Sequence, residues 1–290
     1  MQNFLSSFLY YLIIIPISKL PYRLLYFLSD ILFFLIYKVF RYRKKVVLNN
    51  LMNSFPHLTN KEIYNISNKF YKHFSDIILE IIKGFTISSD QLKKRLLVIN
   101  PEICNTYFSS NQNIFFVGGH FNNWEITSQG FPKYIKHNCI GIYKPLKNKF
   151  LNLKVFESRS KHGTKLVTMS SVKKSIIENK FPHVVMFASD QNPSSTKNAI
   201  WVNFLNQETA VQYGVEKYAI EFNCPVIYVS VDKVKRGYYE VSLHLITDNP
   251  RSLKEGQITK EFTKLLENDI RRNPQYWLWT HKRWKHKRKK

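Results

Sequence analysis

A histidine and a glutamate five positions apart, His120 and Glu125, follow an apolar run in this chain. Residues 113–117 predict a buried strand, Gly118 and Gly119 allow the backbone to turn sharply and to approach a ligand, and the polar residues after them predict the start of a helix. Histidine titrates near neutral pH, so an imidazole held in such a turn can accept a proton from a hydroxyl group. The segment therefore predicts a general base with a carboxylate nearby.

The same residues also have a purely structural interpretation. Asn122 followed three positions later by Glu125 fits a capping box, in which the asparagine caps a helix and the glutamate bonds back to the cap backbone. In that case His120 is an ordinary turn residue. The segment alone favours neither interpretation, and the rest of the chain has to decide.

The composition indicates anionic partners. With 290 residues, the chain can form one large domain, alone or with an appendage. The 44 Lys and Arg residues against 20 Asp and Glu give a net charge of +24, which suits membrane phosphates, an acidic carrier protein or nucleic acid. Cys104, Cys139 and Cys224 form no C-x-x-C pair, so we expect reduced thiols in the core.

The N-terminal segment predicts a membrane anchor. Residues 4–17 are almost entirely apolar, and residues 24–40 are apolar except for Ser29, Asp30 and Lys38. A basic cluster at residues 41–45 follows, as expected beside an anionic cytoplasmic surface. The anchor is either one short span or two helices lying in the interface. A pair of buried core helices is the alternative, whereas the chain lacks the basic start and small-residue site of a cleavable signal peptide.

Beyond the anchor, strand-like and helix-like segments alternate. Residues 114–117, 139–143, 165–168, 183–188, 225–231 and 238–246 predict strands. Helices are predicted at residues 48–84 with a break at 55–59, where Thr59 and Glu62 fit a capping box, and at residues 122–130, 148–161, 171–179, 208–222 and 259–272. This order predicts an α/β fold, a mainly parallel sheet flanked by helices. We expect an anchor at 1–45, the α/β domain at 46–285 and a basic tail at 286–290.

A second acidic residue is predicted to lie beside His120. The strand at 183–188 is followed by Ser189-Asp190-Gln191, so Asp190 leaves a carboxyl edge of the sheet as His120 does. Ligands bind at such edges in parallel sheets, so we expect both loops to line one cleft. The structural alternative for Asp190 is a turn residue before Pro193.

The absence of several known motifs narrows the classes of enzyme to which the chain could belong. It contains no G-x-S-x-G, G-x-x-x-x-G-K-[ST], G-x-G-x-x-G or H-E-x-x-H pattern, which removes the usual support for a serine hydrolase, an NTPase, a nicotinamide enzyme or a zincin. A histidine beside a carboxylate, without a convincing nucleophile, suits a base that activates a substrate hydroxyl for direct attack on an activated acyl group. We expect no metal and no cofactor.

These motifs resemble the lysophospholipid acyltransferase superfamily in its lipid A branch, the late (lauroyl or myristoyl) acyltransferases of lipid A biosynthesis. His120 to Glu125 resembles the H-x-x-x-x-E motif of that family. Further similar segments, in order, are residues 49–51 and 54–56 (N-L…F-P), 143–146 (Y-R-x-L), 189–191 (D-Q), 204–210 (F-x-G-x-x-A-x-T) and 274–285 (W-x-H-R-R-F-K). The resemblance runs from about residue 41 to residue 285.

The resemblance implies a reaction and roles for individual residues. The donor would be a thioester of acyl carrier protein or coenzyme A, and the acceptor a lipid hydroxyl at the cytoplasmic face of a bacterial inner membrane. His120 would be the general base, Glu125 would orient and stabilise the imidazolium, and Asp190 would order the cleft. The other expected substrate-binding residues are Asn122, Lys144, Arg159 and Gln191, of which Lys144 and Arg159 could equally be solvated surface residues.

Departures from the family pattern leave the acceptor open. Lys144 stands where the family has arginine, which replaces a bidentate phosphate clamp with a point charge. Residues 204–207 lack the family's glycine, and Ser194-Ser195 continue the D-Q loop without one. A lysophospholipid or an aminolipid is therefore an alternative acceptor. Outside acyl transfer, the alternatives are a non-catalytic membrane adaptor and, because residues 281–290 are basic around Trp284, a nucleic-acid-binding protein.

Overall fold

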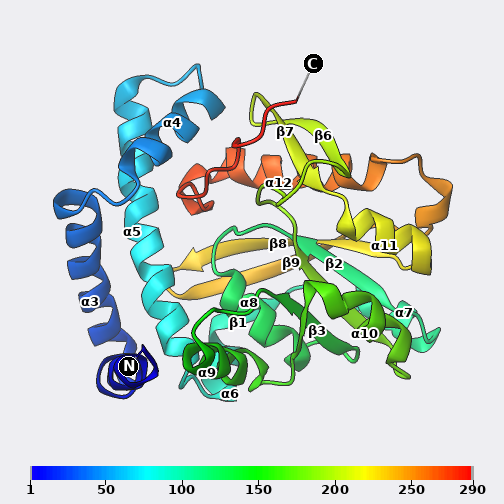
Figure 1. Cartoon of the computed structure of the whole chain (residues 1–290), viewed down its shortest axis with the longest axis horizontal. Helices are drawn as coiled ribbons and strands as arrows, with labels where there is room; N and C mark the ends of the chain where they lie inside the picture. The colour runs from blue at the N-terminus through cyan, green and yellow to red at the C-terminus, as the bar shows by residue number, and fades with distance from the viewer. Residues whose placement is uncertain (1, 289–290) are drawn as a thin grey trace.

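A twisted seven-stranded sheet forms the centre of the molecule (Figure 1). The structure, a computed structural model, describes residues 2–288, with side chains from Leu5 to Arg288; Met1 and the last two positions of the predicted tail lie outside it. The sheet order is β1-β9-β8-β2-β5-β3-β4, and every neighbouring pair is parallel except β8 with β9. The predicted mainly parallel α/β fold is confirmed. The strands are β1 (Leu96–Val98), β2 (Ile114–Gly118), β3 (Asn138–Tyr143), β4 (Lys165–Thr168), β5 (His183–Ala188), β6 (Ala199–Phe204), β7 (Gln207–Gln212), β8 (Val226–Lys235) and β9 (Tyr238–Thr247).

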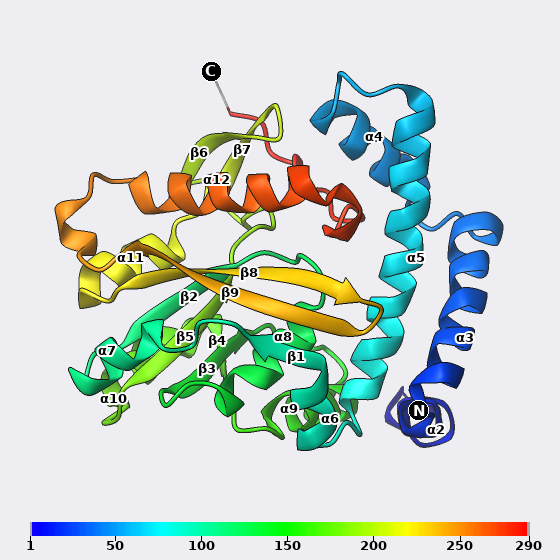
Figure 2. The same cartoon turned by 180° about the vertical axis from the view of Figure 1, so that it is seen from behind.

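Helices cover both faces of the sheet, and the long helix α5 stands across one end of it (Figures 1 and 2). Beyond the N-terminal segment the helices are α4 (Lys44–Ser54), α5 (Asn60–Gly84), α6 (Ser89–Arg95), α7 (Ile103–Ser109), α8 (Trp124–Gly130), α9 (Lys149–Ser160), α10 (Val172–Glu178), α11 (Gly214–Phe222) and α12 (Gln257–Arg272). The capping box of Thr59 and Glu62 starts α5 as predicted.

Strand β2 is buried on both of its faces. Phe115 and Val117 belong to a core shared with α11 and α12, whereas Ile114 and Phe116 belong to a second core that includes residues of α8. A strand buried on both faces is a continuous apolar run, as the sequence has here. The three cysteines are buried and unpaired, as predicted.

The predicted helix 208–222 is wrong over its first part. Residues 207–212 form β7, which pairs antiparallel with β6 in a separate two-stranded sheet. Leu205 and Asn206 connect the two strands and have φ of 50° and 62°. Two left-handed residues are the requirement of a two-residue hairpin turn, but Leu-Asn is not the Asn-Gly signal that would have predicted it. Strand β1 was also missed, because it is only three residues long.

The N-terminal segment forms two helical rods. The first contains α1 (Gln2–Leu9), the π-helix η1 (Tyr10–Ile14) and α2 (Ile15–Lys19); the second contains α3 (Tyr22–Phe34) and the π-helix η2 (Leu35–Val39). The rod of α3 packs beside α5 (Figures 1 and 2). Within residues 2–288, no helix has both the length and the apolar character needed to cross a membrane, so the expectation of a short span is not met. The helical conformation is interrupted at Leu20 and Pro21 between the two rods, and the second rod carries Arg23, Asp30 and Lys38.

The alternative of buried core helices is wrong as well. Leu25 and Ser29 of α3 are buried, but Leu24, Phe27, Ile31 and Phe34 are 43–63% exposed. Their spacing of three and four residues places them on one side of the helix. The first rod likewise exposes Leu5, Phe8, Leu9, Tyr11, Leu12 and Ile13. We call these exposed side chains of the two rods the N-terminal apolar surface.

The turn between β8 and β9 contacts α3, and it yields a prediction on stability. Gly237 has φ of +76°, and a Cβ atom there would overlap the Tyr26 hydroxyl and lie 2.7 Å from Arg95 Nη1. Gly237→Ala should therefore lower the free energy of unfolding by about 1–3 kcal/mol, measured by denaturant titration. Gly214→Ala is the control, because no atom lies within 4 Å of its added Cβ and its φ is not positive. Equal stability of the two variants would contradict this account.

Candidate active site

The register of two neighbouring strands brings His120 and Asp190 together. Gly118 of β2 pairs with Ala188 of β5, so the residues two positions beyond each strand emerge side by side. The His120 ring Nδ1 lies 2.6 Å from Asp190 Oδ1, and the His120 backbone N–H donates to Asp190 Oδ2 over 2.9 Å. The prediction that both loops leave one edge of the sheet is confirmed.

The Asp190 carboxylate is buried and held by several donors. Besides His120 it accepts a hydrogen bond from the indole Nε1 of Trp277, at 2.8 Å, and only 2% of its side chain is exposed. Burial alone would raise its pKa, but the imidazole beside it and the donated hydrogen bonds outweigh burial and lower the pKa to about 2. The carboxyl group is therefore ionised at neutral pH.

The ionised carboxylate determines which histidine nitrogen carries the lone pair. Because a carboxylate only accepts, Nδ1 of His120 must carry the proton, and Nε2 of the neutral ring then carries the lone pair. The Gln191 side-chain nitrogen, which is a donor, lies 3.3 Å from this Nε2. Burial would lower the pKa of His120, but the negative charge of Asp190 outweighs this, and the net shift is upward. The Trp124 ring packs edge-on against the imidazole at 5.0 Å between centroids.

Glu125 is bonded to an arginine. Both of its carboxylate oxygens accept from Arg159 of α9, which donates through Nε at 2.9 Å and through Nη2. The predicted capping box of Asn122 with Glu125 does not form, because Asn123 is the N-cap of α8 and accepts from the Ile126 N–H at 3.0 Å. Glu125 and Arg159 thus form a bidentate ion pair next to the histidine loop.

Asn122 supports the loop from inside the protein. It is fully buried with φ of 52°, a left-handed conformation that asparagine tolerates better than most residues. Its Nδ2 donates to the Val231 carbonyl at 2.6 Å, and its backbone N–H donates to the Tyr276 carbonyl. The sharp turn expected at the two glycines therefore occurs at Asn122. Gly119 is needed for close packing instead, because a Cβ there would lie 2.8 Å from the Leu266 side chain.

A cavity of about 290 Å³ opens beside His120. Trp124, Glu125 and Arg159 line it together with His120, and the exposed Lys144 also borders it. Its remaining wall consists largely of apolar residues from β2, β3, β5, β8 and the end of α8, among them Phe116, Phe131, Ile142, Met186, Val229 and Val231. A polar group set beside an apolar cavity is the usual arrangement for binding a ligand with a hydrocarbon portion.

The structure brings most of the predicted site residues together and adds two. His120, Glu125, Lys144 and Arg159 share the cavity, Asp190 and Gln191 contact the imidazole, and Asn122 lies behind the loop. Trp277 and Trp124 had no predicted role. Trp277 belongs to the closing segment that suggested the family resemblance, so its position in that motif was a usable signal.

Comparison with known proteins identifies the family of the chain. A model of the family described as bacterial lipid A biosynthesis acyltransferase matches residues 1–286. A comparison with curated protein sequences finds no match. Because the family model covers almost all of the 290 residues, the chain belongs to the bacterial lipid A biosynthesis acyltransferases and is an acyltransferase.

Proposed function

We propose that the protein transfers a fatty acyl chain from a thioester of acyl carrier protein or coenzyme A to a hydroxyl group of a lipid A precursor or a related glycolipid. The observation that carries the proposal is the His120–Asp190 pair beside a cavity with apolar walls. The pair supplies a base for a hydroxyl group, and the cavity supplies an environment for a fatty chain.

In the proposed reaction the acceptor hydroxyl is the nucleophile. Its oxygen attacks the thioester carbonyl carbon while Nε2 of His120 removes its proton. The tetrahedral intermediate then collapses, the carbon–sulfur bond breaks, and the thiolate leaves and takes the proton from the imidazolium. The Asp190 carboxylate holds Nδ1–H and stabilises the positive ring, as the acidic member of a catalytic triad does, with the substrate oxygen in place of serine.

In this proposal Glu125 stabilises the imidazolium, and Arg159 binds a negatively charged phosphate of a substrate. The Glu125 carboxylate raises the pKa of His120 through space, so it helps to stabilise the imidazolium, while the hydrogen bond that orients the ring comes from Asp190. Arg159 is half-buried and borders the cavity, where it can bind a phosphate of the donor or the acceptor. Lys144 adds a second positive charge for the same purpose.

The N-terminal apolar surface is the proposed contact with the membrane. It consists of large apolar side chains on the two N-terminal rods, whose helices α2 and α3 pack against α5. The basic residues Arg41, Arg43, Lys44 and Lys45 follow directly in the chain. Amphipathic helices with an exposed apolar side and neighbouring basic residues bind in the interface of anionic bilayers. We therefore place the protein on the cytoplasmic face of the inner membrane, where a lipid acceptor is available.

The removal of the base tests the reaction. His120→Ala should lower acyl transfer by about two to four orders of magnitude, the scale of a general base, without unfolding the protein. The measurement uses purified protein, acyl thioesters of both carriers and a panel of a lipid A precursor, a lysophospholipid and an aminolipid, with products identified by mass. Activity within tenfold of the wild type would reject His120 as the base. Acylation of another acceptor alone would leave the base intact and reject the proposed substrate.

The pH dependence tests the role of Asp190. Only the neutral imidazole accepts a proton, so kcat/KM should rise with pH through the raised pKa of His120, above its ordinary value of about 6.5. Asp190→Asn removes the negative charge, so this rise should move to lower pH while the plateau falls by about 10²–10⁴-fold. Asp232→Asn is the control, because Asp232 forms an exposed pair with Arg272. An unshifted profile in Asp190→Asn would contradict the assignment.

Liposome binding tests the apolar surface. Phe27→Ser with Phe34→Ser should weaken binding to anionic vesicles by at least about tenfold, because each phenyl ring contributes about 1.5–3 kcal/mol when buried in an apolar environment. Phe181→Ser is the matched control, since Phe181 is 71% exposed but lies outside the N-terminal apolar surface. Equal losses for both proteins, or tight salt-sensitive binding to duplex DNA with none to vesicles, would count against the proposal.

A further inference from the structure

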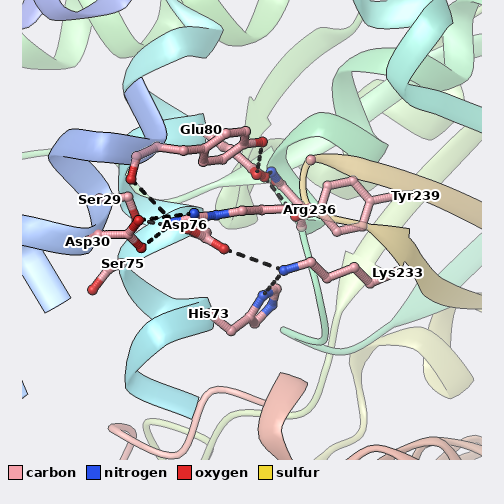
Figure 3. Close-up of polar contacts among 12 residues, drawn as sticks. Ser29, Asp30, His73, Ser75, Asp76, Glu80, Lys233, Arg236 and Tyr239 are labelled. Carbon is pink, nitrogen blue, oxygen red and sulfur yellow. Dashed lines mark hydrogen bonds and ion pairs between the residues drawn. The ribbon is translucent and has the colours of Figure 1, made fainter. Parts of the chain in front are cut away.

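Helix α5 carries a line of buried ionisable residues that the proposed reaction does not use. His73, Asp76 and Glu80 are spaced by three and four residues, so they lie on one side of the helix, and all three are buried. Figure 3 shows them between α3 on one side and the β8–β9 hairpin on the other. Buried charges are costly unless they are bonded, so their partners indicate what they do.

Asp76 joins α3 to the hairpin. It accepts from Ser29 Oγ at 2.8 Å and from Arg236 Nη2 at 2.6 Å, and Lys233 Nζ lies 3.4 Å from its other oxygen (Figure 3). Arg236 also pairs with Asp30 of α3. These contacts are between three scaffold elements, and a structural role accounts for them.

Glu80 differs, because one of its partners belongs to the active-site loop. Its carboxylate accepts from the Tyr26 hydroxyl of α3 at 2.7 Å and from the Tyr239 hydroxyl of β9 at 2.7 Å. The third donor is Nδ2 of Asn123, at 2.6 Å. Asn123 is 1% exposed, so its amide has no access to solvent. Glu80 is its hydrogen-bonding partner inside the protein.

The two ends of the Asn123 amide have different tasks. Nδ2 bonds to Glu80, which fixes the rotation of the amide and directs Oδ1 toward the start of α8. There Oδ1 accepts from the Ile126 N–H at 3.0 Å and caps the helix. The first two residues of that helix are Trp124, which packs on the His120 ring, and Glu125, which binds Arg159.

We propose that Glu80 is a positioning residue for the acyl-transfer reaction, and that it acts through Asn123 on the capped start of α8, and thereby on Trp124 and Glu125. The inference rests on the proposed function of His120. Without the Glu80 acceptor, the buried Asn123 Nδ2 loses its bond and the amide can turn away from the cap. The first turn of α8 then loosens beside the imidazole, where a displacement of about 1 Å is enough to lower catalysis by about a hundredfold.

An exchange of donor and acceptor tests this contact in steady-state kinetics with the full-length protein. Glu80→Gln places two amide groups face to face, and Asn123→Asp places two carboxylates face to face. Each should lower kcat by about ten- to a hundredfold, with KM for the thioester within about threefold. In the double variant, the new amide at position 80 donates to the new carboxylate at position 123. Its kcat should return to within about fivefold of wild type, a non-additivity expected of residues that contact each other.

Two further variants separate positioning from stability. Glu62→Ala removes the exposed side chain that completes the capping box at the far end of α5, and it should leave kcat unchanged while lowering stability. Asn123→Ser keeps a capping oxygen and loses the donor to Glu80, so it tests the contact even if Glu80→Gln does not fold. It should lower kcat about tenfold.

The outcomes distinguish this inference from the proposed function. Additive losses in the double variant, or a kcat for Asn123→Ser equal to wild type, would overturn the role of Glu80. A kcat loss that follows the unfolding temperature across all variants, including Glu62→Ala, would make Glu80 a stability residue only. If His120→Ala retains activity, the proposed role of His120 as the base fails irrespective of these results.

Discussion

The bond between the His120 ring and the Asp190 carboxylate requires two loops to leave adjacent strands at the same level. These residues are 70 positions apart in the chain, and their separation is set by the in-register pairing of β2 with β5. A slip of one residue would turn every side chain of one strand to the opposite face and would also separate this pair. The two cores that alternate along β2 fix the register, so the packing of the sheet and the geometry of the site have the same cause.

Three closely spaced residues of the histidine loop bond to different parts of the molecule. His120 is bonded to Asp190 after β5, Asn122 to Val231 of β8 and to Tyr276, and Asn123 to Glu80 of α5. Loops are usually the mobile part of a fold, but these bonds leave this loop little conformational freedom, and they hold Asn122 in a left-handed conformation. This arrangement suits a base that must hold one orientation. If the imidazole rotated, it would lose the hydrogen bond that fixes its tautomer, and Nε2 would no longer point toward the substrate.

Short-range patterns in the sequence predicted much of this and missed what depends on distant partners. Apolar runs predicted β2, β3, β4, β5 and β8, and the period-two alternation of residues 238–246 predicted β9. The histidine motif and Asp190 could be placed at one edge because both follow such strands. The pairing of His120 with Asp190 rather than with Glu125 could not be predicted, because Glu125 is nearer in sequence and its partner Arg159 comes from α9. Glu80 could not be identified from the sequence either, because it occupies one polar position in an amphipathic helix and its partners come from α3, β9 and the histidine loop.

The N-terminal rods are connected to the site through α9. Ser6 of α1 accepts a hydrogen bond from Asn148, the N-cap of α9, at 2.7 Å, and the Tyr10 ring packs edge-on against Phe150. Arg159 lies on the cavity wall near the other end of the same helix. It follows Lys149, the first residue of α9, by ten residues, or about 15 Å along the helix axis. Because α9 contacts both the first rod and the cavity, the rod and the cavity are held at a fixed distance. If the surface lies in a bilayer as proposed, α9 connects the membrane contact to the cavity wall that Arg159 forms.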